Sequence, residues 1–339
     1  MAGEGTLHLL LPGLLGPVPR AAARAPEVLG RFPGLADLLN RSTAERSPSG
    51  ELTTLLAARL EDPDALCAGP LGLVAEGVDP AEGYWFRADP VMLHPDRDRI
   101  VVFHGGPALP EPSETDELVM AFNGFFSGDG VELRAPAPQR WYLRVPEALA
   151  TVTTTPLHAV IGRGMGEALP RGEQAGRWAS LLNEAQMLFH THPVNQVRQD
   201  QGRPMINGIW PWGGGRLRPL RWRNELAGLH GDDLTLIGLG KHTGVQVAPL
   251  DLDRLPETDD GDHLVVCDGP ARALAEQDLG AWLAWLEALE RGWFRGLAAS
   301  RRRVRLDAGT GRAWTRTGGG RWRFWRRRHD LDRWLSLEG

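Results

Sequence analysis

The run T6LHLLL11 is the segment that decides the fold class. It is short, almost continuously apolar and closed by Pro12 and Gly13, as is typical of a strand buried on both faces of a parallel sheet. Apolar residues at roughly helical spacing follow between residues 19 and 40. A strand followed by a helix at the start of the chain predicts an α/β protein.

Two later segments have the composition of the first strand, D233LTLIGLG240 and H263LVVCDG269, and each runs into glycine where the chain must turn. Both are predicted to be buried strands. Residues 275–297 carry leucine and tryptophan on one face and predict an amphipathic helix. The segment Y84WFRADPVMLHPDRDRIVVF103 predicts two strands joined by a polar turn, and a helix with Ser113 as its N-cap follows.

The composition is that of an ordinary globular protein, with 42% hydrophobic and 24% charged residues in a chain of 339. A net charge of −5 provides no general attraction to nucleic acid or to an anionic membrane, so neither is a predicted partner. Cys67 and Cys267 lie far apart in apolar surroundings and predict free thiols in a reducing compartment. No apolar run is long enough to span a bilayer, and the expected location is the cytoplasm.

The middle of the chain holds its densest set of polar residues, W178ASLLNEAQMLFHTHPVNQVRQDQGRPMINGIWPWGGG215. Apolar residues at three- and four-residue spacing predict a helix in its first half, which ends at Pro193. The polar residues around and beyond that proline are of the types that bind an anionic small molecule through a guanidinium, side-chain amides and closely approaching backbone. The predicted ligand-binding residues are His192, Asn195, Arg198, Asn207, Gly213 and Gly215.

The order of these residues carries a family resemblance. The pattern HPVN-x2-R-x3-G-x-P-x2-N over residues 192–207, followed by a glycine-rich turn, resembles a segment of the archaeal-type cofactor-independent phosphoglycerate mutases. The whole chain resembles the bacterial RpfE-type regulatory proteins, which are related to those mutases. The resemblance implies a three-layer, alkaline-phosphatase-like α/β core with a smaller inserted α+β domain. We expect the core in residues 1–90 and 216–339 and the inserted domain in residues 91–215.

The metal-binding positions of that family are only partly kept. Such a core holds two divalent metals with carboxylates and histidines at strand ends, and a serine carries the phosphoryl group. In this chain the first strand carries no acid at its end. Asp268 and Asp307 match acidic ligands, but Arg272 and Ala308 stand where the resemblance leads us to expect histidine. Each lost ligand weakens metal binding, so the predicted metal content is none.

The segment R46SPSGELTTLL56 corresponds in place to the turn that carries the nucleophilic serine of the family. Ser47 and Ser49 are therefore the two candidate nucleophiles. Both are also good helix-capping residues, and capping is the competing interpretation.

Two further polar segments have interpretations that do not involve a catalytic site. Asp259, Asp260 and Asp262 precede His263 in an acidic loop, which we interpret as a solvated loop before a strand. The segment W322RFWRRR328 interleaves aromatics with arginines, and it predicts a terminal strand with a basic face or a surface that binds a macromolecule.

Three functional hypotheses follow. The leading one is a catalytically degenerate relative of the mutases, a pseudoenzyme without cofactor, that binds a phosphorylated metabolite or a protein partner in a regulatory role. The second is an active phosphoglycerate mutase or phosphohydrolase that uses Mn or Zn with Ser47 or Ser49, Asp268 and Asp307. The third is an interaction protein that binds a macromolecule. Whether the chain is an enzyme is left open between the first two.

Overall fold

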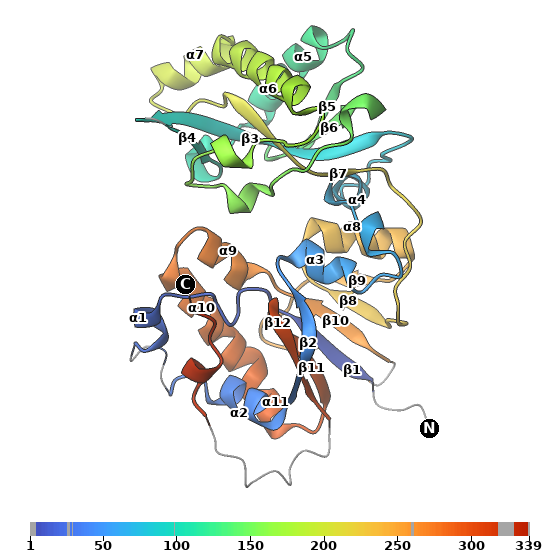
Figure 1. The fold of residues 1–339 in the computed structure, drawn as a ribbon, viewed down its shortest axis with the longest axis vertical. Helices are drawn as coiled ribbons and strands as arrows, with labels where there is room; N and C mark the ends of the chain where they lie inside the picture. Colours follow the sequence, from blue (N-terminus) through green and yellow to red (C-terminus); the bar gives the residue numbers. More distant parts are fainter. Residues whose placement is uncertain are drawn as a thin grey trace. The chain divides into compact units, whose positions relative to one another are not determined.

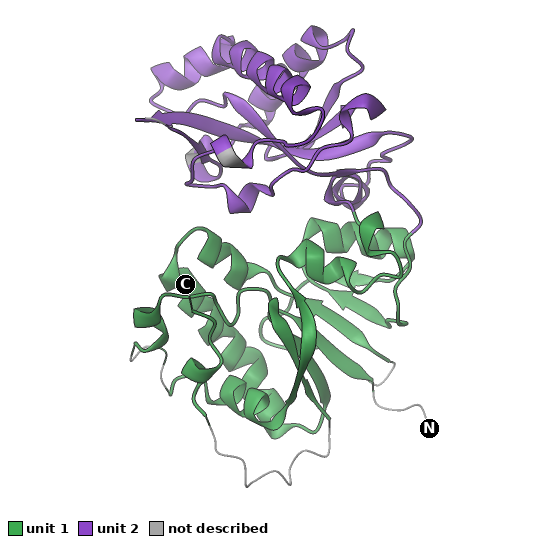
Figure 2. Ribbon diagram, viewed as in Figure 1, with its two compact units in different colours: residues 1–66, 220–339 green, residues 67–219 purple. Residues whose placement is uncertain are grey.

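The computed structural model describes residues 5–25, 28, 30–97, 99–258, 261–317 and 329–337, and the statements below concern these residues. The chain divides into two compact units (Figure 2). Unit 1 comprises residues 1–66 and 220–339, and unit 2 comprises residues 67–219. Unit 2 is therefore an insertion in the sequence of unit 1. Asp259, Asp260 and the segment W322RFWRRR328 lie outside the described residues.

Unit 1 is built on a seven-stranded sheet in the order β2-β12-β11-β1-β10-β8-β9. The strand β1 (Thr6–Leu10) lies in its interior and pairs in parallel with β10 and β11, which confirms the buried strand predicted there. The edge formed by β12 and β2 is antiparallel. The other strands are β2 (Thr43–Ser49), β8 (Gly228–His230), β9 (Val247–Ala248), β10 (His263–Val266), β11 (Arg303–Asp307) and β12 (Thr310–Arg316).

Helices cover both faces of this sheet (Figure 1). On one face Leu7 and Leu9 join a core with α2, α10 and α11, and on the opposite face Leu10 packs with α3 and α8. Alternate residues of β1 therefore serve two separate cores, and the predicted three-layer α/β architecture is confirmed. The helices of unit 1 are α1 (Arg20–Ala23), α2 (Pro33–Arg41), α3 (Leu52–Ala57), η1 (Pro63–Ala65), α8 (Leu234–Thr243), α9 (Gly269–Ala275), α10 (Leu279–Leu289), the π-helical η6 (Glu290–Phe294), α11 (Arg295–Ala299) and η8 (Leu331–Arg333).

The strand predicted over residues 233–240 is wrong, because this segment forms helix α8. The Asp233 side chain accepts the Leu236 backbone N–H at 3.1 Å and caps the first turn. The helix ends at Gly244, whose φ of 77° is the left-handed conformation of a glycine C-cap. A short apolar run followed by glycine is compatible with a buried helix as well as with a buried strand, and here the aspartate cap decides for the helix.

Unit 2 contains an antiparallel sheet with helices on both faces. Helices α5 and α6 pack on the face that carries Phe86 and Trp141, and on the other face α4 lies against β3 and β7. The strands are β3 (Tyr84–Asp96), β4 (Arg99–Phe103), β5 (Glu132–Ala137), β6 (Arg140–Val145) and β7 (Gly208–Gly215). The helices are α4 (Ala68–Ala75), η2 (Gly106–Ala108), α5 (Pro112–Phe125), η3 (Glu147–Leu149), η4 (Leu157–Ala159), η5 (Gly166–Ala168), α6 (Ala175–His190) and α7 (Pro193–Asp200).

Three local predictions are corrected in unit 2. The first boundary falls after Leu66 instead of residue 90, because α4 and the whole of β3 pack within unit 2; the second falls after residue 219 instead of 215. The N-cap of α5 is Glu111 and not Ser113, and Glu111 and Glu114 together form a capping box. Pro193 does end α6, but it also starts α7, since proline is well tolerated in a first helical turn.

Both cysteines are free thiols, as predicted. Burial raises the pKa of the Cys267 thiol to about 12, which leaves it protonated and unreactive at neutral pH. In the part of the chain that the structure describes, no helix is both long enough and apolar enough to cross a bilayer.

Candidate functional site

Arg198, the predicted main anion contact, is buried in unit 2 and bonded to protein groups. Its side chain is 0% exposed. Its Nε–H donates to the Pro204 carbonyl at 2.6 Å, and an Nη1–H donates to Glu114 Oε2 at 2.6 Å. The carboxylate of Glu114 also caps α5 by accepting the Glu111 backbone N–H. Arg198 therefore ties α7 to the start of α5, and its geometry gives it a structural role instead of a ligand-binding one.

The neighbouring predicted ligand contacts have structural roles of the same kind. The amide of Asn195 donates to the carbonyls of Phe189 and Ile206 and accepts the Ile206 N–H, all within 2.8 Å. The amide of Asn207 exchanges hydrogen bonds with both backbone groups of Leu93. His192 is the N-cap of α7, where its ring accepts the Val194 N–H at 3.3 Å. The side chains of Arg198, Asn195 and Asn207 thus hold backbone groups of unit 2 in place.

The glycine run at the end of β7 is required for packing. A Cβ added to Gly213 would come within 2.7 Å of the Ala68 Cβ, and one added to Gly215 would come within 2.0 Å of the Cys67 Sγ. Both contacts are at the start of α4. Gly213 and Gly215 therefore let α4 approach β7 closely, which is a different reason for glycine from the predicted approach of backbone to a ligand.

Two of the candidate catalytic residues do come together in unit 1. The Ser47 hydroxyl, on β2, donates a hydrogen bond to Asp307 Oδ2 at the end of β11. The Gly309 N–H donates to the other carboxylate oxygen of Asp307 at 3.1 Å. The Asp307 residue is only 2% exposed. The pairing arises because β12 lies between β11 and β2 and is antiparallel to both. The end of β11, which carries Asp307, and the end of β2, which carries Ser47, therefore lie at the same edge of the sheet.

The other two candidates lie apart from this pair. Ser49 is exposed on β2 and does not line a pocket with Ser47. Asp268 follows β10 at the start of α9, where its carboxylate forms an ion pair with Arg272 at 3.3 Å. The arginine that stands in the expected histidine position therefore neutralises the neighbouring acid.

Ser47 and Asp307 line a pocket with a volume of about 270 Å³ on the α3 side of the unit 1 sheet. We call it the Arg59 pocket. Its size suits a small metabolite. Its lining combines polar groups with an apolar wall and consists of His8, Ser47, Pro48, Leu55, Ala58, Arg59, Trp222, Arg223, Asn224, Leu226, Leu264, Arg305 and Asp307.

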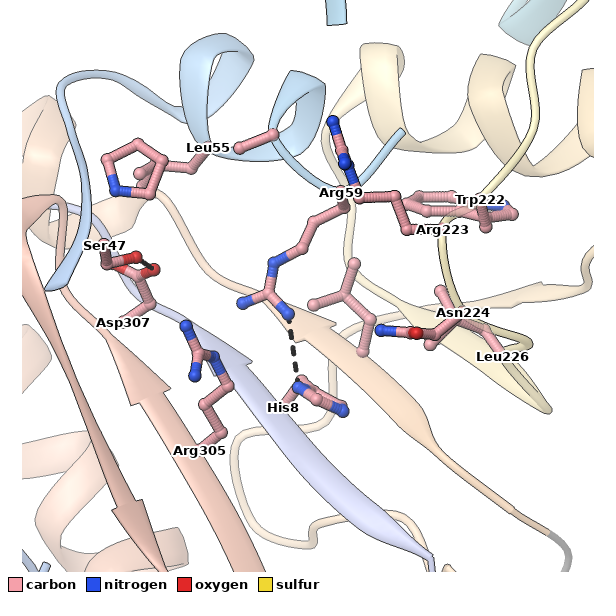
Figure 3. Close-up of a pocket in the computed structure, with 13 residues that line it drawn as sticks. His8, Ser47, Leu55, Arg59, Trp222, Arg223, Asn224, Leu226, Arg305 and Asp307 are labelled. Atoms are coloured by element: carbon pink, nitrogen blue, oxygen red, sulfur yellow. Dashed lines mark hydrogen bonds between the residues drawn. The ribbon is translucent and has the colours of Figure 1, made fainter. Parts of the chain in front are cut away.

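The charge of the Arg59 pocket is dominated by arginine. Among the residues that the structure describes, Arg59, Arg223 and Arg305 line the pocket together with a single carboxylate, that of Asp307. The guanidiniums of Arg59 and Arg305 point into the same space, with the Ser47 hydroxyl beside them (Figure 3). Arg305 is ion-paired with Glu45, whereas the buried Nη2 of Arg59 has no hydrogen-bond partner among the described residues. Burial lowers the pKa of Arg59, and the charge of Asp307 acts in the opposite direction.

His8 lies at the inner end of the pocket, on β1. Its Nδ1 is 3.2 Å from Arg59 Nη1, and its Nε2 is 3.1 Å from Asp262 Oδ2. Asp262 also accepts the Thr6 N–H at 2.7 Å. Burial alone would raise the pKa of Asp262, but these hydrogen bonds outweigh it and hold that pKa below its usual value.

The strand ends do not fit the two-metal centre that the resemblance implies. Asp268 is paired with Arg272, and Asp307 accepts hydrogen bonds from Ser47 and Gly309. Within the described ranges, no three histidine, cysteine, aspartate or glutamate side chains are grouped so that they could hold a metal ion. An arginine, Arg59, is the cation beside Asp307. We therefore derive no step that passes through a metal.

The arginines and the histidine of this pocket were not among the site residues predicted from the sequence. In a chain where Lys241 is the single lysine among 38 basic residues, no one arginine stands out. His8 had a usable signal, because it is the one polar residue inside the apolar run 7–11. A polar group in a strand buried on both faces needs partners, and those partners mark a site.

The sequence relatives of this chain are phosphoglycerate mutases. No family model matches the chain. The probable 2,3-bisphosphoglycerate-independent phosphoglycerate mutase of Geobacter sulfurreducens is 28% identical over 253 residues, which cover 72% of this chain and 62% of that protein. The 2,3-bisphosphoglycerate-independent phosphoglycerate mutase 2 of Methanothermobacter thermautotrophicus is 26% identical over 250 residues, 72% of this chain and 61% of that protein. The chain thus spans less than two thirds of their length.

Among solved structures, the PH0037 protein of Pyrococcus horikoshii has a TM-score of 0.56 at 14% identity, over 97% of this chain and 91% of that one. This likeness shows a shared fold. Together with the sequence relatives, it makes the chain similar to the cofactor-independent phosphoglycerate mutases, with an alkaline-phosphatase-like fold.

Proposed function

We propose that unit 1 binds a small phosphorylated metabolite in the Arg59 pocket and that the chain is a catalytically degenerate relative of the phosphoglycerate mutases with a regulatory role, as in RpfE-type proteins. The observation that carries the proposal is the Arg59 guanidinium, whose buried Nη2 has no partner among the described residues and which points into the same space as Arg305, beside Ser47. Two guanidiniums provide donors of the charge and planar geometry that a phosphate group accepts, and the Ser47 hydroxyl beside them donates to Asp307.

Replacement of Arg59 by methionine is expected to raise the Kd for 3-phosphoglycerate by about 10- to 100-fold, because charge-assisted hydrogen bonds contribute about 1.5–3 kcal/mol. Methionine keeps much of the aliphatic volume and removes the donors. Calorimetric titration of metal-stripped protein measures the change, with glycerate as the matched ligand that lacks the phosphate. Arg177→Met, at an exposed position of unit 2, is the control and should leave the Kd unchanged. Equal affinity for glycerate and 3-phosphoglycerate contradicts the proposal.

The active-enzyme alternative is supported by one contact, the hydrogen bond from Ser47 to Asp307, because a carboxylate in that position could activate a serine. We expect no conversion of 3-phosphoglycerate to 2-phosphoglycerate, followed by phosphorus NMR, before or after manganese or zinc is added to metal-stripped protein. Turnover that depends on added metal and disappears in Ser47→Ala, but persists in Ser49→Ala, would establish the enzyme and overturn the degenerate assignment.

A further inference from the structure

The contacts of His8 determine which ring nitrogen carries the proton. A guanidinium has donors only, so the Arg59 Nη1–H must donate to His8 Nδ1 across the 3.2 Å that separates them. The proton of a neutral ring is then on Nε2, which donates to Asp262 Oδ2 at 3.1 Å. Asp262 is itself held by the Thr6 N–H. The result is a chain of hydrogen bonds in which Arg59 donates to His8 and His8 donates to Asp262, and it links the Arg59 pocket to the residue that precedes β10.

This chain restrains the guanidinium that the pocket depends on. Arg59 follows α3, and its guanidinium is held by the hydrogen bond from Nη1 to His8. With Nη1 held by the ring, the buried Nη2 is left without a hydrogen-bond partner among the described residues. A fixed planar guanidinium loses less freedom on binding an anion than a mobile one does.

The charges around His8 oppose its protonation. Arg59 and Arg305 face the ring, from the segment after α3 and from β11, and Asp262 is the acid on its other side. Asp307 is close to Arg59. Burial lowers the pKa of His8, and the two arginines lower it further, whereas Asp262 acts in the opposite direction. At neutral pH the ring is therefore uncharged and able to accept from Arg59.

We propose that His8 is a positioning residue for Arg59 and that it acts only as the neutral Nε2–H tautomer, so that the affinity of the pocket for a phosphorylated ligand falls on acidification. This inference rests on the proposed function. A second proton on His8 would place an Nδ1–H against the Arg59 N–H, and two donors cannot share that position. The guanidinium would then be displaced from the orientation that presents Nη2 to the ligand.

The test uses inorganic sulfate as the probe beside 3-phosphoglycerate, because sulfate keeps its charge from pH 5 to 8 and a phosphate monoester does not. Because the pKa of His8 is lowered, wild-type protein is expected to lose sulfate affinity toward the acidic end of this range, by about tenfold once the ring is protonated, the order of one lost charge-assisted hydrogen bond. His8→Gln provides an uncharged acceptor and donor that does not titrate. It should bind sulfate at pH 8 within about threefold of wild type and show no loss on acidification. His190→Gln, on an exposed residue of α6, is the control and should keep the wild-type profile.

Three results separate the two proposals. If wild type binds sulfate and His8→Gln keeps the same pH dependence, the role of His8 is overturned and the proposed function stands. If neither wild type nor any variant binds either anion at any pH, the proposed function fails.

Independently of any ligand, nitrogen-15 NMR of the His8 ring should report the Nε2–H tautomer at pH 7.5 in the full chain, and an Nδ1–H tautomer would overturn the inference. His8→Phe should weaken binding at every pH by about tenfold, as expected for a lost positioning contact.

Discussion

Replacement of Arg198 by methionine is expected to lower the free energy of unfolding of unit 2 by about 3–5 kcal/mol, the range for breaking a buried ion pair from one side. The substitution removes the donors for the Pro204 carbonyl and for Glu114, and both of these acceptors are only partly exposed. Glu114 would remain beside Arg203, which lies 2.9 Å from its other oxygen. That second arginine limits the loss and keeps the expected value inside the stated range.

Urea denaturation followed by tryptophan fluorescence measures this effect, since Trp178 is buried in the unit 2 core. The matched control is Arg203→Met, which removes the partly exposed partner of the same carboxylate and should cost about 1 kcal/mol or less. Both variants should bind 3-phosphoglycerate as wild type does, provided the protein is folded. A stable Arg198→Met protein that has lost ligand binding would restore the ligand-binding role predicted from the sequence.

Substitution of Gly213 by alanine is expected to destabilise unit 2 by about 2–5 kcal/mol, for two independent reasons. The residue has φ +61°, a conformation that side chains rarely adopt, and the new Cβ would come within 2.7 Å of the Ala68 Cβ. Neither conflict can be relieved by rotating a side chain, because both involve backbone or Cβ positions. Movement of α4 away from β7 is the remaining response.

The same urea denaturation experiment measures the loss in free energy of unfolding caused by Gly213→Ala. The control is Gly176→Ala in α6, where an added Cβ meets nothing within 4 Å. Alanine in a helix is favoured over glycine by up to about 1 kcal/mol, so this variant should be equally or more stable than wild type. If Gly213→Ala is as stable as wild type, the packing explanation of the glycine run is wrong.

The predictable part of the fold is the part that depends on apolar pattern. The buried strands β1 and β10 and the hairpin of β3 and β4 follow from runs of apolar residues and from the polar turn between them. Helix α8 was not predictable in the same way, because its apolar run is equally suited to a strand and its cap is a single aspartate. A run of apolar residues shows that a segment is buried, but it does not show whether that segment is a helix or a strand.

Only part of the candidate site was predicted from the sequence, namely the pair Ser47 and Asp307. Ser47 and Asp307 were candidates because the resemblance to the mutases implies a serine turn and an acidic residue after a strand at these places, and the structure brings this pair together. Arg198 and Asn195 were misinterpreted because a buried structural network uses the same residue types as a ligand site. The role of Arg59 depends on which arginine the fold buries beside His8, and that is a property of tertiary structure.

The interleaving of the two units has a consequence for biosynthesis. The strand β1 is made long before its neighbours β10 and β11, which begin only at His263 and Arg303. Unit 2 is complete and has its own core long before that point. During translation the apolar β1 is therefore unpaired while unit 2 is made and folds. Unpaired strands of this kind are prone to aggregate. The nascent chain of this protein should consequently need chaperone protection for its first 66 residues until synthesis has passed residue 307.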